Sequence, residues 1–220
     1  MSQIKLFSAR ACPFAHRTRL VLSHKKLPFE LVEVDLQNKP AWFDAKLSGY
    51  GKVPALEHNG QHLWESAVVN EYLEEVFPEP RLLPVDAVER ARARIWIDYA
   101  NTRFVGAFGK LLRLREDGDE AAARRELTES LSFIERGLAA DGPFFLGAEP
   151  SLVDLAFYPW FERWPALEQL RSFPLPRELE RLHRWVAAVR ELPAVREHAN
   201  APDYYVQRYR STIAPRKAVA

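Results

Sequence analysis

Short apolar runs alternate with segments of helical periodicity over the first part of the chain. The pattern predicts a strand over Ile4 to Phe7, a helix from about Pro13 to His24, a strand over Phe29 to Val34 and a helix near Trp42 to Lys46. A strand, a helix and a second strand at this spacing favour a parallel pair of strands, because the connecting helix crosses back over the sheet.

A hairpin and a helix follow this unit. In VPALEHNGQHLWE, the dipeptide Asn59-Gly60 separates two short runs that can pair, and both residues accept positive φ, so the pattern predicts a tight antiparallel turn. A helix then begins at Ser66 and ends before Pro78, with one apolar face made by Val68, Val69, Tyr72, Leu73, Val76 and Phe77. The order β-α-β, hairpin and closing helix predicts a thioredoxin-like domain over residues 1–77.

Beyond residue 77 the pattern becomes helical throughout. The segment PEPRLLPVD, residues 78–86, carries three prolines and is typical of a linker between domains. Residues 87–220 contain no strand pattern and predict a helical bundle. Apolar positions recur there at helical spacing: Phe104, Phe108 and Leu111; Leu127, Leu131, Ile134 and Leu138; and Leu179, Leu182, Val186 and Val189.

One segment of the bundle is apolar on every side. SLVDLAFYPWF opens with Ser151 and Asp154 in a capping-box arrangement, and its continuous apolar character predicts a helix buried at the centre of the bundle. The tail from Ala199 onward is rich in Tyr and Arg and is expected to lie over the surface.

Composition narrows the function classes. Apolar residues make up 47% of the 220 residues and charged residues 28%, which is ordinary for a globular protein. Lys and Arg number 31 against 30 for Asp and Glu, so the charge excess that holds nucleic acid is absent. The start MSQIKLFSAR lacks the apolar run of a secretory signal, and no segment approaches the roughly 20 apolar residues of a membrane span. We expect a cytoplasmic protein without a nucleic-acid or membrane partner.

The one cysteine of the chain, Cys12, lies between the first strand and the first helix. Pro13 is favoured at the first position of a helix, which places the thiol at a helix N-terminus, where unpaired N–H groups and the helix dipole stabilise a thiolate. Arg17 or Arg19 could add a positive field. The alternative is a buried, inert cysteine, which the turn position disfavours. Ala15 occupies the place of the second cysteine of a dithiol motif, so a mixed disulfide would be resolved by an external thiol.

Two further features suit a ligand beside this thiol. Val53-Pro54 precedes a strand, where a cis proline would leave a backbone edge free to pair with an extended peptide; a plain tight turn is the alternative. Glu65-Ser66 begins a helix, where Ser66 could cap the helix and free N–H groups could bind a ligand carboxylate; simple capping is the alternative.

Three other clusters suggest no separate site. His58 and His62 flank the hairpin turn without further ligands, so we expect no metal. The basic segment ERARAR, residues 89–94, is typical of a solvated helix face or a dimer surface. The aromatic residues of the buried helix are most simply core, although some could line an apolar pocket that opens toward Cys12 and receives a second substrate: Trp160, Phe161 and Trp164, together with Phe104 and Phe108.

Five motifs together resemble the cytosolic glutathione transferases: CPFAHRTRLVL, NKPAWF, KVPALE, ESAVVNEYLEE and YPWFERW. The resemblance covers nearly the whole chain, and the cysteine in the first motif makes it most similar to the omega class. It implies a glutathione-binding domain followed by a helical substrate-binding domain, a homodimer, and glutathione as co-substrate. It also implies that Cys12 forms a mixed disulfide with glutathione and that Phe14 packs beside it.

The same resemblance assigns the remaining glutathione contacts. Lys39 meets the glycyl end of the tripeptide, and Val53 offers backbone hydrogen bonds to the cysteinyl unit ahead of a cis Pro54. Glu65 and Ser66 hold the γ-glutamyl group. The loop KLSGYGKVP departs from the family pattern, because it is a residue longer and lacks the usual Asn-Pro, so the shape of the glycyl subsite stays open.

The leading interpretation is a glutathione-dependent thiol transferase or reductase. The resemblance implies small disulfides, dehydroascorbate and glutathione S-conjugates as substrates. One alternative is a transferase that conjugates glutathione to electrophiles. Such enzymes use a hydroxyl to stabilise the glutathione thiolate, and Ser8 carries the nearby candidate hydroxyl. Another is a non-catalytic regulatory relative, which the retained site residues disfavour. A membrane-inserting relative is disfavoured by the polar first helix.

Overall fold

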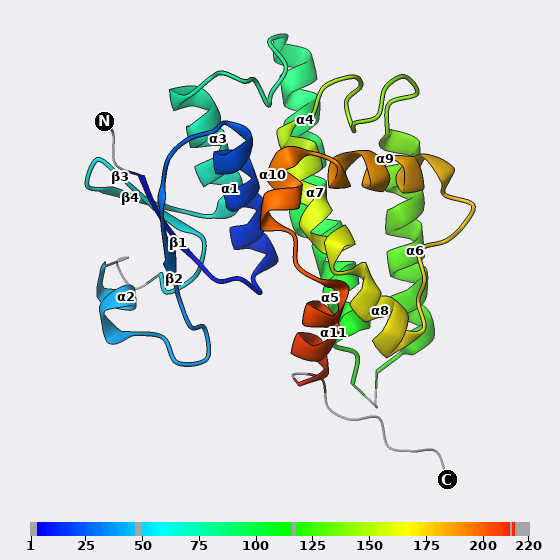
Figure 1. Ribbon diagram of the computed structural model, residues 1–220. Coiled ribbons are helices and arrows are strands. Elements are labelled where there is room, and N and C mark those ends of the chain that lie inside the picture. Colours follow the sequence, from blue (N-terminus) through cyan, green and yellow to red (C-terminus); the bar gives the residue numbers. More distant parts are fainter. Residues whose placement is uncertain (1–3, 47–49, 116–117, 212, 214–220) are drawn as a thin grey trace. The chain divides into compact units, whose positions relative to one another are not determined.

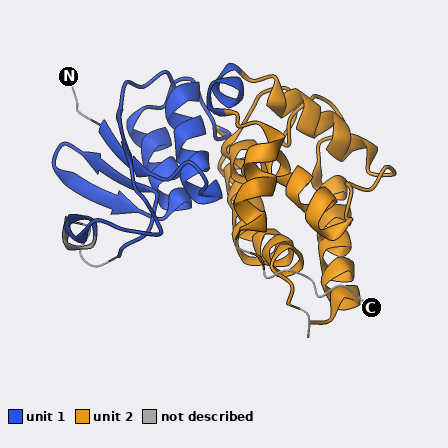
Figure 2. Ribbon diagram, turned by 60° about the horizontal axis from the view of Figure 1, so that its bottom comes forward, with its two compact units in different colours: residues 1–84, 193–198 blue, residues 85–192, 199–220 orange. Residues whose placement is uncertain are grey.

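The computed structural model describes residues 4–46, 50–115, 118–211 and 213 (Figure 1). The chain divides into two compact units, residues 1–84 with 193–198 and residues 85–192 with 199–220 (Figure 2). The first unit carries a sheet and the second is helical, so the two patterns seen along the sequence correspond to two kinds of architecture.

The sheet of the first unit has four strands in the order β2-β1-β3-β4: β1 Ile4–Ser8, β2 Glu30–Glu33, β3 Ala55–His58 and β4 Gln61–Trp64. β1 pairs in parallel with β2 and antiparallel with β3, with Leu6 opposite both Leu31 and Leu56. The hairpin between β3 and β4 turns at Asn59 and Gly60, whose φ values are 51° and 77°. The predicted parallel pair and hairpin are both confirmed.

Helices cover both faces of this sheet. α1 (Pro13–His24) and α3 (Ser66–Val76) pack side by side on one face (Figure 1). On the other face α2 (Ala41–Lys46) places Phe43 against Phe7 of β1, with ring centroids 6.0 Å apart. This is the predicted thioredoxin-like arrangement.

The apolar face of α3 is narrower than its sequence predicts. Val69 and Leu73 are fully buried, whereas Val68 is 57% exposed and Val76 43% exposed. Only one stripe of a helix can face a sheet and a neighbouring helix at once, and polar Asn70 completes that buried stripe.

A buried ion pair fastens the first part of the predicted linker to the first unit. Lys25 Nζ lies 2.6 Å from Glu74 Oε2 and donates to the carbonyl oxygens of Phe77 and Pro80. The other oxygen of Glu74 accepts from the backbone N–H groups of Leu82 and Leu83 at 2.9 and 3.0 Å. Because both charges are buried and hydrogen-bonded, the chain leaves this unit along a fixed path.

The second unit is built from helices: α4 Ala87–Tyr99, α5 Val105–Leu112, α6 Glu120–Gly137, α7 Leu152–Glu162, α8 Trp164–Arg171, α9 Glu180–Arg190 and α11 Pro202–Arg210. A π-helical turn, Ala100–Phe104, continues α4 into α5. Among its described residues there is no strand, and Phe144 and Gly147 form an isolated bridge. None of the described helices of the protein combines the length and the apolar character that crossing a bilayer requires.

α7 lies at the centre of the second unit, with each of its residues buried. The predicted capping box is present: the Ser151 side chain accepts from the backbone N–H of Asp154, and the backbone N–H of Ser151 donates to Asp154 Oδ2 at 2.7 Å. The Ser151 hydroxyl also donates to Oδ2 at 2.7 Å. Oδ1 of Asp154 accepts from Phe145 N and Trp185 Nε1 at 2.7 and 2.6 Å. One buried carboxylate therefore fixes the start of α7, the preceding loop and α9.

The C-terminal segment differs from its prediction. α10 (Pro193–His198) belongs to the first unit, where it packs on α1. The prediction that the chain lies over the surface from Ala199 onward is wrong for α11. This helix packs on α8 and buries Tyr205 and Val206. The Arg163 guanidinium lies 4.2 Å from the Tyr205 ring centroid, so the polar composition of this helix conceals a buried cation–π contact.

Candidate active site

Cys12 occupies the N-cap position of α1, and its side chain makes no capping hydrogen bond. Its backbone is extended, with φ −77° and ψ 118°, and Pro13 follows it in the first turn of the helix. The side chain is partly exposed and packs against an apolar cluster that includes Phe7 and Val53. The thiol donates to the carbonyl oxygen of Val53 over 3.6 Å. The predicted position of the thiol at the helix N-terminus is confirmed.

The turn that carries Cys12 is held by Arg19. Its guanidinium donates to Ser8 Oγ at 2.5 Å and to the carbonyl oxygens of Ala9 and Arg10 at 3.2 and 3.4 Å. Cys12 N donates to the Ala9 carbonyl oxygen at 2.9 Å. Ser8 is fully buried, and its hydroxyl is engaged by Arg19, so it is poorly placed to bind a glutathione thiolate.

Arg17 is the cation that interacts with Cys12. Its guanidinium is buried, donates to Ser66 Oγ at 3.3 Å and lies 5.2 Å from the Phe14 ring centroid. Burial lowers the pKa of Arg17 to about 9, while negative charge on Cys12 acts in the opposite direction. Arg17 is therefore a cation at neutral pH and interacts electrostatically with Cys12. Of the two arginines considered from the sequence, Arg17 has this interaction and Arg19 holds the turn that carries Cys12.

The loop before β3 brings two further predicted residues together. The Val53-Pro54 peptide bond is cis, as the resemblance implies, and both residues are buried. Lys39 Nζ donates to the carbonyl oxygen of Gly51 at 2.9 Å, which places this cation beside the same loop. Residues 47–49 lie outside the described residues, so the question of the glycyl subsite shape raised by this loop stays open there.

The start of α3 differs from the capping expectation. Glu65 occupies the N-cap position with φ 66° and ψ 112°, and Ser66 is the first helical residue. The expectation that Ser66 caps the helix is wrong, because its hydroxyl accepts from Arg17 instead. Backbone of this kind in a non-glycine residue is uncommon and concentrates at ligand sites.

Tyr50 is a residue that sequence reasoning missed. Its hydroxyl donates to Glu65 Oε1, and its ring stacks on Trp64 with centroids 5.5 Å apart. Burial and the neighbouring carboxylate of Glu65 raise the pKa of Tyr50, so the hydroxyl stays a donor at neutral pH. The available signal was an aromatic residue between two glycines, in SGYGK. Tyr50 orients the carboxylate of Glu65.

The four aromatic residues predicted to line a second-substrate pocket lie in the second unit. Phe104, Phe108, Trp160 and Trp164 are between 0% and 6% exposed. Phe108 and Trp164 have ring centroids 5.8 Å apart. The indole N–H of Trp164 is buried without a hydrogen-bond partner among the described residues. Their role toward a substrate stays a prediction.

The two histidines of the hairpin have separate partners. His58 Nδ1 is 2.7 Å from the Tyr72 hydroxyl, and His62 Nε2 is 3.2 Å from Glu57 Oε2. Within the part of the chain that the structure describes, no three His, Cys, Asp or Glu side chains gather as metal ligands.

A thioredoxin-like unit with a cysteine at the start of α1 and a cis-proline loop, followed by an all-helical unit, defines the architectural class of the glutathione transferases. Two family models match the chain: the glutathione S-transferase N-terminal domain over residues 11–76 and the glutathione S-transferase C-terminal domain over residues 86–188. The chain belongs to the glutathione S-transferase family.

Several relatives within the family are of the omega class. The chain is 34% identical to glutathione S-transferase omega-1 of Mus musculus over 89% of its own length and 80% of that protein. Among solved structures, glutathione transferase Omega 2C of Trametes versicolor is 26% identical with TM-score 0.84, and the match covers 98% of this chain and 100% of that one. Rice GST1 in complex with glutathione is 30% identical with TM-score 0.88, covering 96% of each chain.

Proposed function

We propose that the protein is an omega-type, glutathione-dependent thiol transferase that works through a mixed disulfide between Cys12 and glutathione. The observation that carries the proposal is the placement of the one thiol of the chain. Cys12 occupies the N-cap position of α1 beside the cis-proline loop, and the buried guanidinium of Arg17 interacts electrostatically with it. A thiolate, and not a thiol, is the nucleophile in disulfide exchange.

The reaction is a pair of exchanges. The Cys12 thiolate attacks the glutathionyl sulfur of a mixed disulfide, which forms a Cys12–glutathione disulfide and releases the substrate thiolate to take up a proton. The thiolate of a second glutathione then attacks the glutathionyl sulfur on Cys12. Glutathione disulfide leaves and the Cys12 thiolate returns. Because the chain has a single cysteine, the second thiol comes from solution.

Glutathione binding is proposed on residues of the first unit. The backbone of Val53, next to cis Pro54, offers hydrogen bonds to the cysteinyl unit, and Lys39 meets the glycyl carboxylate. At the start of α3, Glu65 and Ser66 hold the γ-glutamyl group. Phe14, 36% exposed, packs beside the sulfur. The glutathione complex of the rice relative supports glutathione as the ligand.

Small disulfides, dehydroascorbate and glutathione S-conjugates are the proposed substrates. The apolar part of a second substrate would contact the aromatic set Phe104, Phe108, Trp160 and Trp164. The unpartnered indole N–H of Trp164 is a donor that a carbonyl oxygen could accept from. We place this chemistry in the cytoplasm, where reduced glutathione keeps a lone thiol available.

We also propose a homodimer. On the first unit, Val68 of α3 is 57% exposed, and on the second unit Val88 and Ile95 of α4 are 60% and 65% exposed. Apolar side chains this exposed on helices suit a partner, and a second copy of the chain is the partner that the family resemblance implies.

A panel assay tests the function. The purified protein, Cys12→Ser and Cys12→Ala would be assayed for reduction of hydroxyethyl disulfide, for dehydroascorbate reduction and for conjugation of an aryl chloride. We expect the wild type to be active in the first two assays with ping-pong kinetics, and both variants to lose these activities while still binding glutathione. Full disulfide reduction by Cys12→Ser, or conjugation as the dominant wild-type activity, would reject the proposal.

A further inference from the structure

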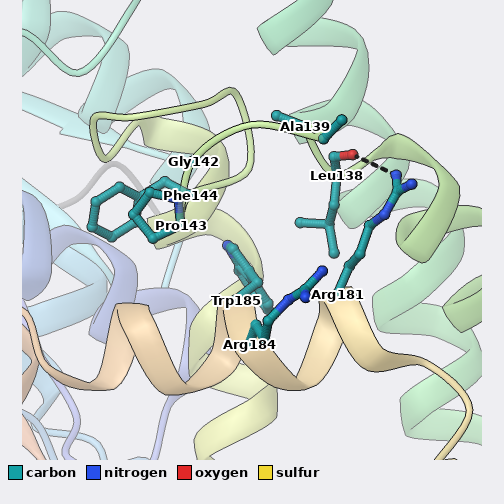
Figure 3. A pocket seen from close by; sticks show the side chains of 9 residues that line it. Leu138, Ala139, Gly142, Pro143, Phe144, Arg181, Arg184 and Trp185 are labelled. Carbon is teal, nitrogen blue, oxygen red and sulfur yellow. Dashed lines mark hydrogen bonds between the residues drawn. The ribbon is translucent and has the colours of Figure 1, made fainter.

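A cavity of about 340 Å³ lies in the second unit between α9 and the loop that follows α6 (Figure 3). Its volume is within the range of small-molecule sites. All its lining residues belong to the second unit, whereas Cys12, Val53 and Ser66 belong to the first. The cavity therefore shares no residue with the thiol site.

The walls of this cavity are fixed by hydrogen bonds. Ala139 N donates to the Phe145 carbonyl oxygen at 3.0 Å, and the backbones of Phe144 and Gly147 exchange two hydrogen bonds of 2.9 and 3.1 Å. A Cβ at Gly142, where φ is 102°, would lie 2.3 Å from the backbone of Gly147, so the loop is tightly closed. A preformed site loses little entropy when a ligand binds.

One side of the cavity is flat and apolar. Trp185 of α9 is 2% exposed. Its indole N–H donates to Asp154 Oδ1 at 2.6 Å, and this hydrogen bond fixes the plane of the ring. Pro143 and Phe144 line the cavity from the loop (Figure 3). These groups offer apolar contacts and no charged group of their own.

The other side carries two guanidinium groups. Arg181 and Arg184 are three residues apart and rise from α9 toward the loop (Figure 3). Arg181 donates to the Leu138 carbonyl oxygen over a long 3.5 Å, and Arg184 has no hydrogen bond or ion pair with the described residues. The nearby Glu135 carboxylate accepts from the backbone N–H groups of Arg181 and Leu182 instead. Both positive charges are left available to a ligand.

We propose that this cavity binds a small organic anion with a flat apolar body, such as an aromatic carboxylate. The carboxylate lies between Arg181 and Arg184, whose planar donors match its two oxygens. The ring lies against Pro143, Phe144 and Trp185. An inorganic anion would leave the apolar wall uncovered, and a neutral aromatic compound would leave both cations unpaired. The proposal goes beyond the thiol chemistry and does not depend on it.

Calorimetry with naphthalene-1-carboxylate tests the proposal, with naphthalene-1-carboxamide and inorganic phosphate as comparison ligands. We expect one carboxylate per chain, weaker binding at high salt, and about tenfold weaker binding of the amide and of phosphate, as for the loss of a charge-assisted hydrogen bond or of ring burial. Equal affinity for the amide would show that the arginines are not used. Equal affinity for phosphate would show that the apolar wall is not used. Either result overturns the proposal.

Three variants locate the binding site. Arg184→Gln removes one cation from the exposed end of a side chain, and Ala140→Glu adds a carboxylate at an exposed lining position; each should weaken the carboxylate about tenfold or more. Arg177→Gln, an exposed arginine outside the cavity, is the matched control and should bind as the wild type does. Wild-type affinity in both Arg184→Gln and Ala140→Glu would place the ligand elsewhere and reject the site. Thiol-transfer activity of Arg184→Gln should be unchanged.

Discussion

Arg17 donates a hydrogen bond of 3.3 Å to the hydroxyl of Ser66, and both side chains are buried. The contact joins the helix that carries the proposed nucleophile to the start of the helix that is proposed to hold the γ-glutamyl group. Arg17 thus interacts electrostatically with Cys12 and donates to the first residue of α3. The proposed roles of Cys12 and Ser66 can be tested separately, because each side chain can be replaced without changing the other.

Replacing Arg17 by Gln should slow alkylation of Cys12 by iodoacetamide at pH 7 about tenfold, since a buried positive charge next to a thiolate is worth on the order of 1 kcal/mol or more. Arg17 is a positioning residue, so the effect should shrink as the pH rises and the thiolate forms without help. The exposed Arg81→Gln is the control. A folded Arg17→Gln protein that is alkylated at the wild-type rate at pH 7 would remove Arg17 from the mechanism.

Ser66→Ala should weaken glutathione binding about tenfold in calorimetry while lowering the free energy of unfolding by only about 1 kcal/mol, the value of one hydrogen bond. The stability cost is small because Ser66 does not cap α3. Ser132→Ala, whose hydroxyl donates to its own helix at Thr128, provides the comparison. Unchanged glutathione affinity in Ser66→Ala would argue against its assignment to the γ-glutamyl group.

Acidification should loosen the attachment of α10 to α1. Burial lowers the pKa of His198 below its usual value, with the charge of Arg19 acting in the same direction and that of Glu197 opposing it. His198 Nε2 lies 2.8 Å from Ser23 Oγ. A histidine with a lowered folded pKa contributes stability that is complete above about pH 6.5 and is lost as the pH falls through the folded value.

The measurement for His198 is urea unfolding at pH 7, 6 and 5. The wild type should lose stability between pH 7 and 5, and His198→Gln should lose less over the same range because it has no proton to take up. His183→Gln changes an exposed histidine and should keep the wild-type slope. Identical pH dependence in the wild type and His198→Gln would contradict the prediction.

Sedimentation should find a dimer at micromolar concentration. Ile95→Glu, at a position 65% exposed in the chain, should shift the protein toward monomer, because a buried charge at an interface is costly. Val85→Glu, at a position 69% exposed in the segment before α4, tests whether the effect depends on position. A wild-type protein that is monomeric at this concentration would reject the homodimer.

Local signals were enough for several features of both units. The predicted bounds of α1 match the observed helix because Pro13 favours its start and the apolar periodicity is strong. The turn at Asn59 and Gly60 needs only residues that accept positive φ, and the capping box of Ser151 and Asp154 needs only a three-residue spacing. Each of these features is decided by neighbours in sequence.

The partners of the site residues were decided by the tertiary structure. Arg17 and Ser66 are 49 residues apart in the chain, and Lys39 reaches Gly51 through a loop whose path no periodicity predicts. Tyr50 meets Glu65 only because the hairpin brings the two ends of its strands together. Sequence motifs therefore pointed to the proposed nucleophile and to the segments proposed to bind glutathione, but not to the contacts that these residues make with distant parts of the chain.

In the second unit, too, the sequence predicted the helices but not the surfaces that they pack against. Helical spacing predicted a bundle, yet α11 was expected in a surface tail, because a short helix rich in Tyr and Arg has no apolar stripe that stands out. The residues of α10 were expected in the bundle and belong to the first unit. No sequence motif singled out Arg181 and Arg184, and it is the closed loop opposite them that makes a cavity. Periodicity records which face of a helix is apolar; which surface that face meets depends on contacts between distant parts of the chain, and these exist only in the folded protein.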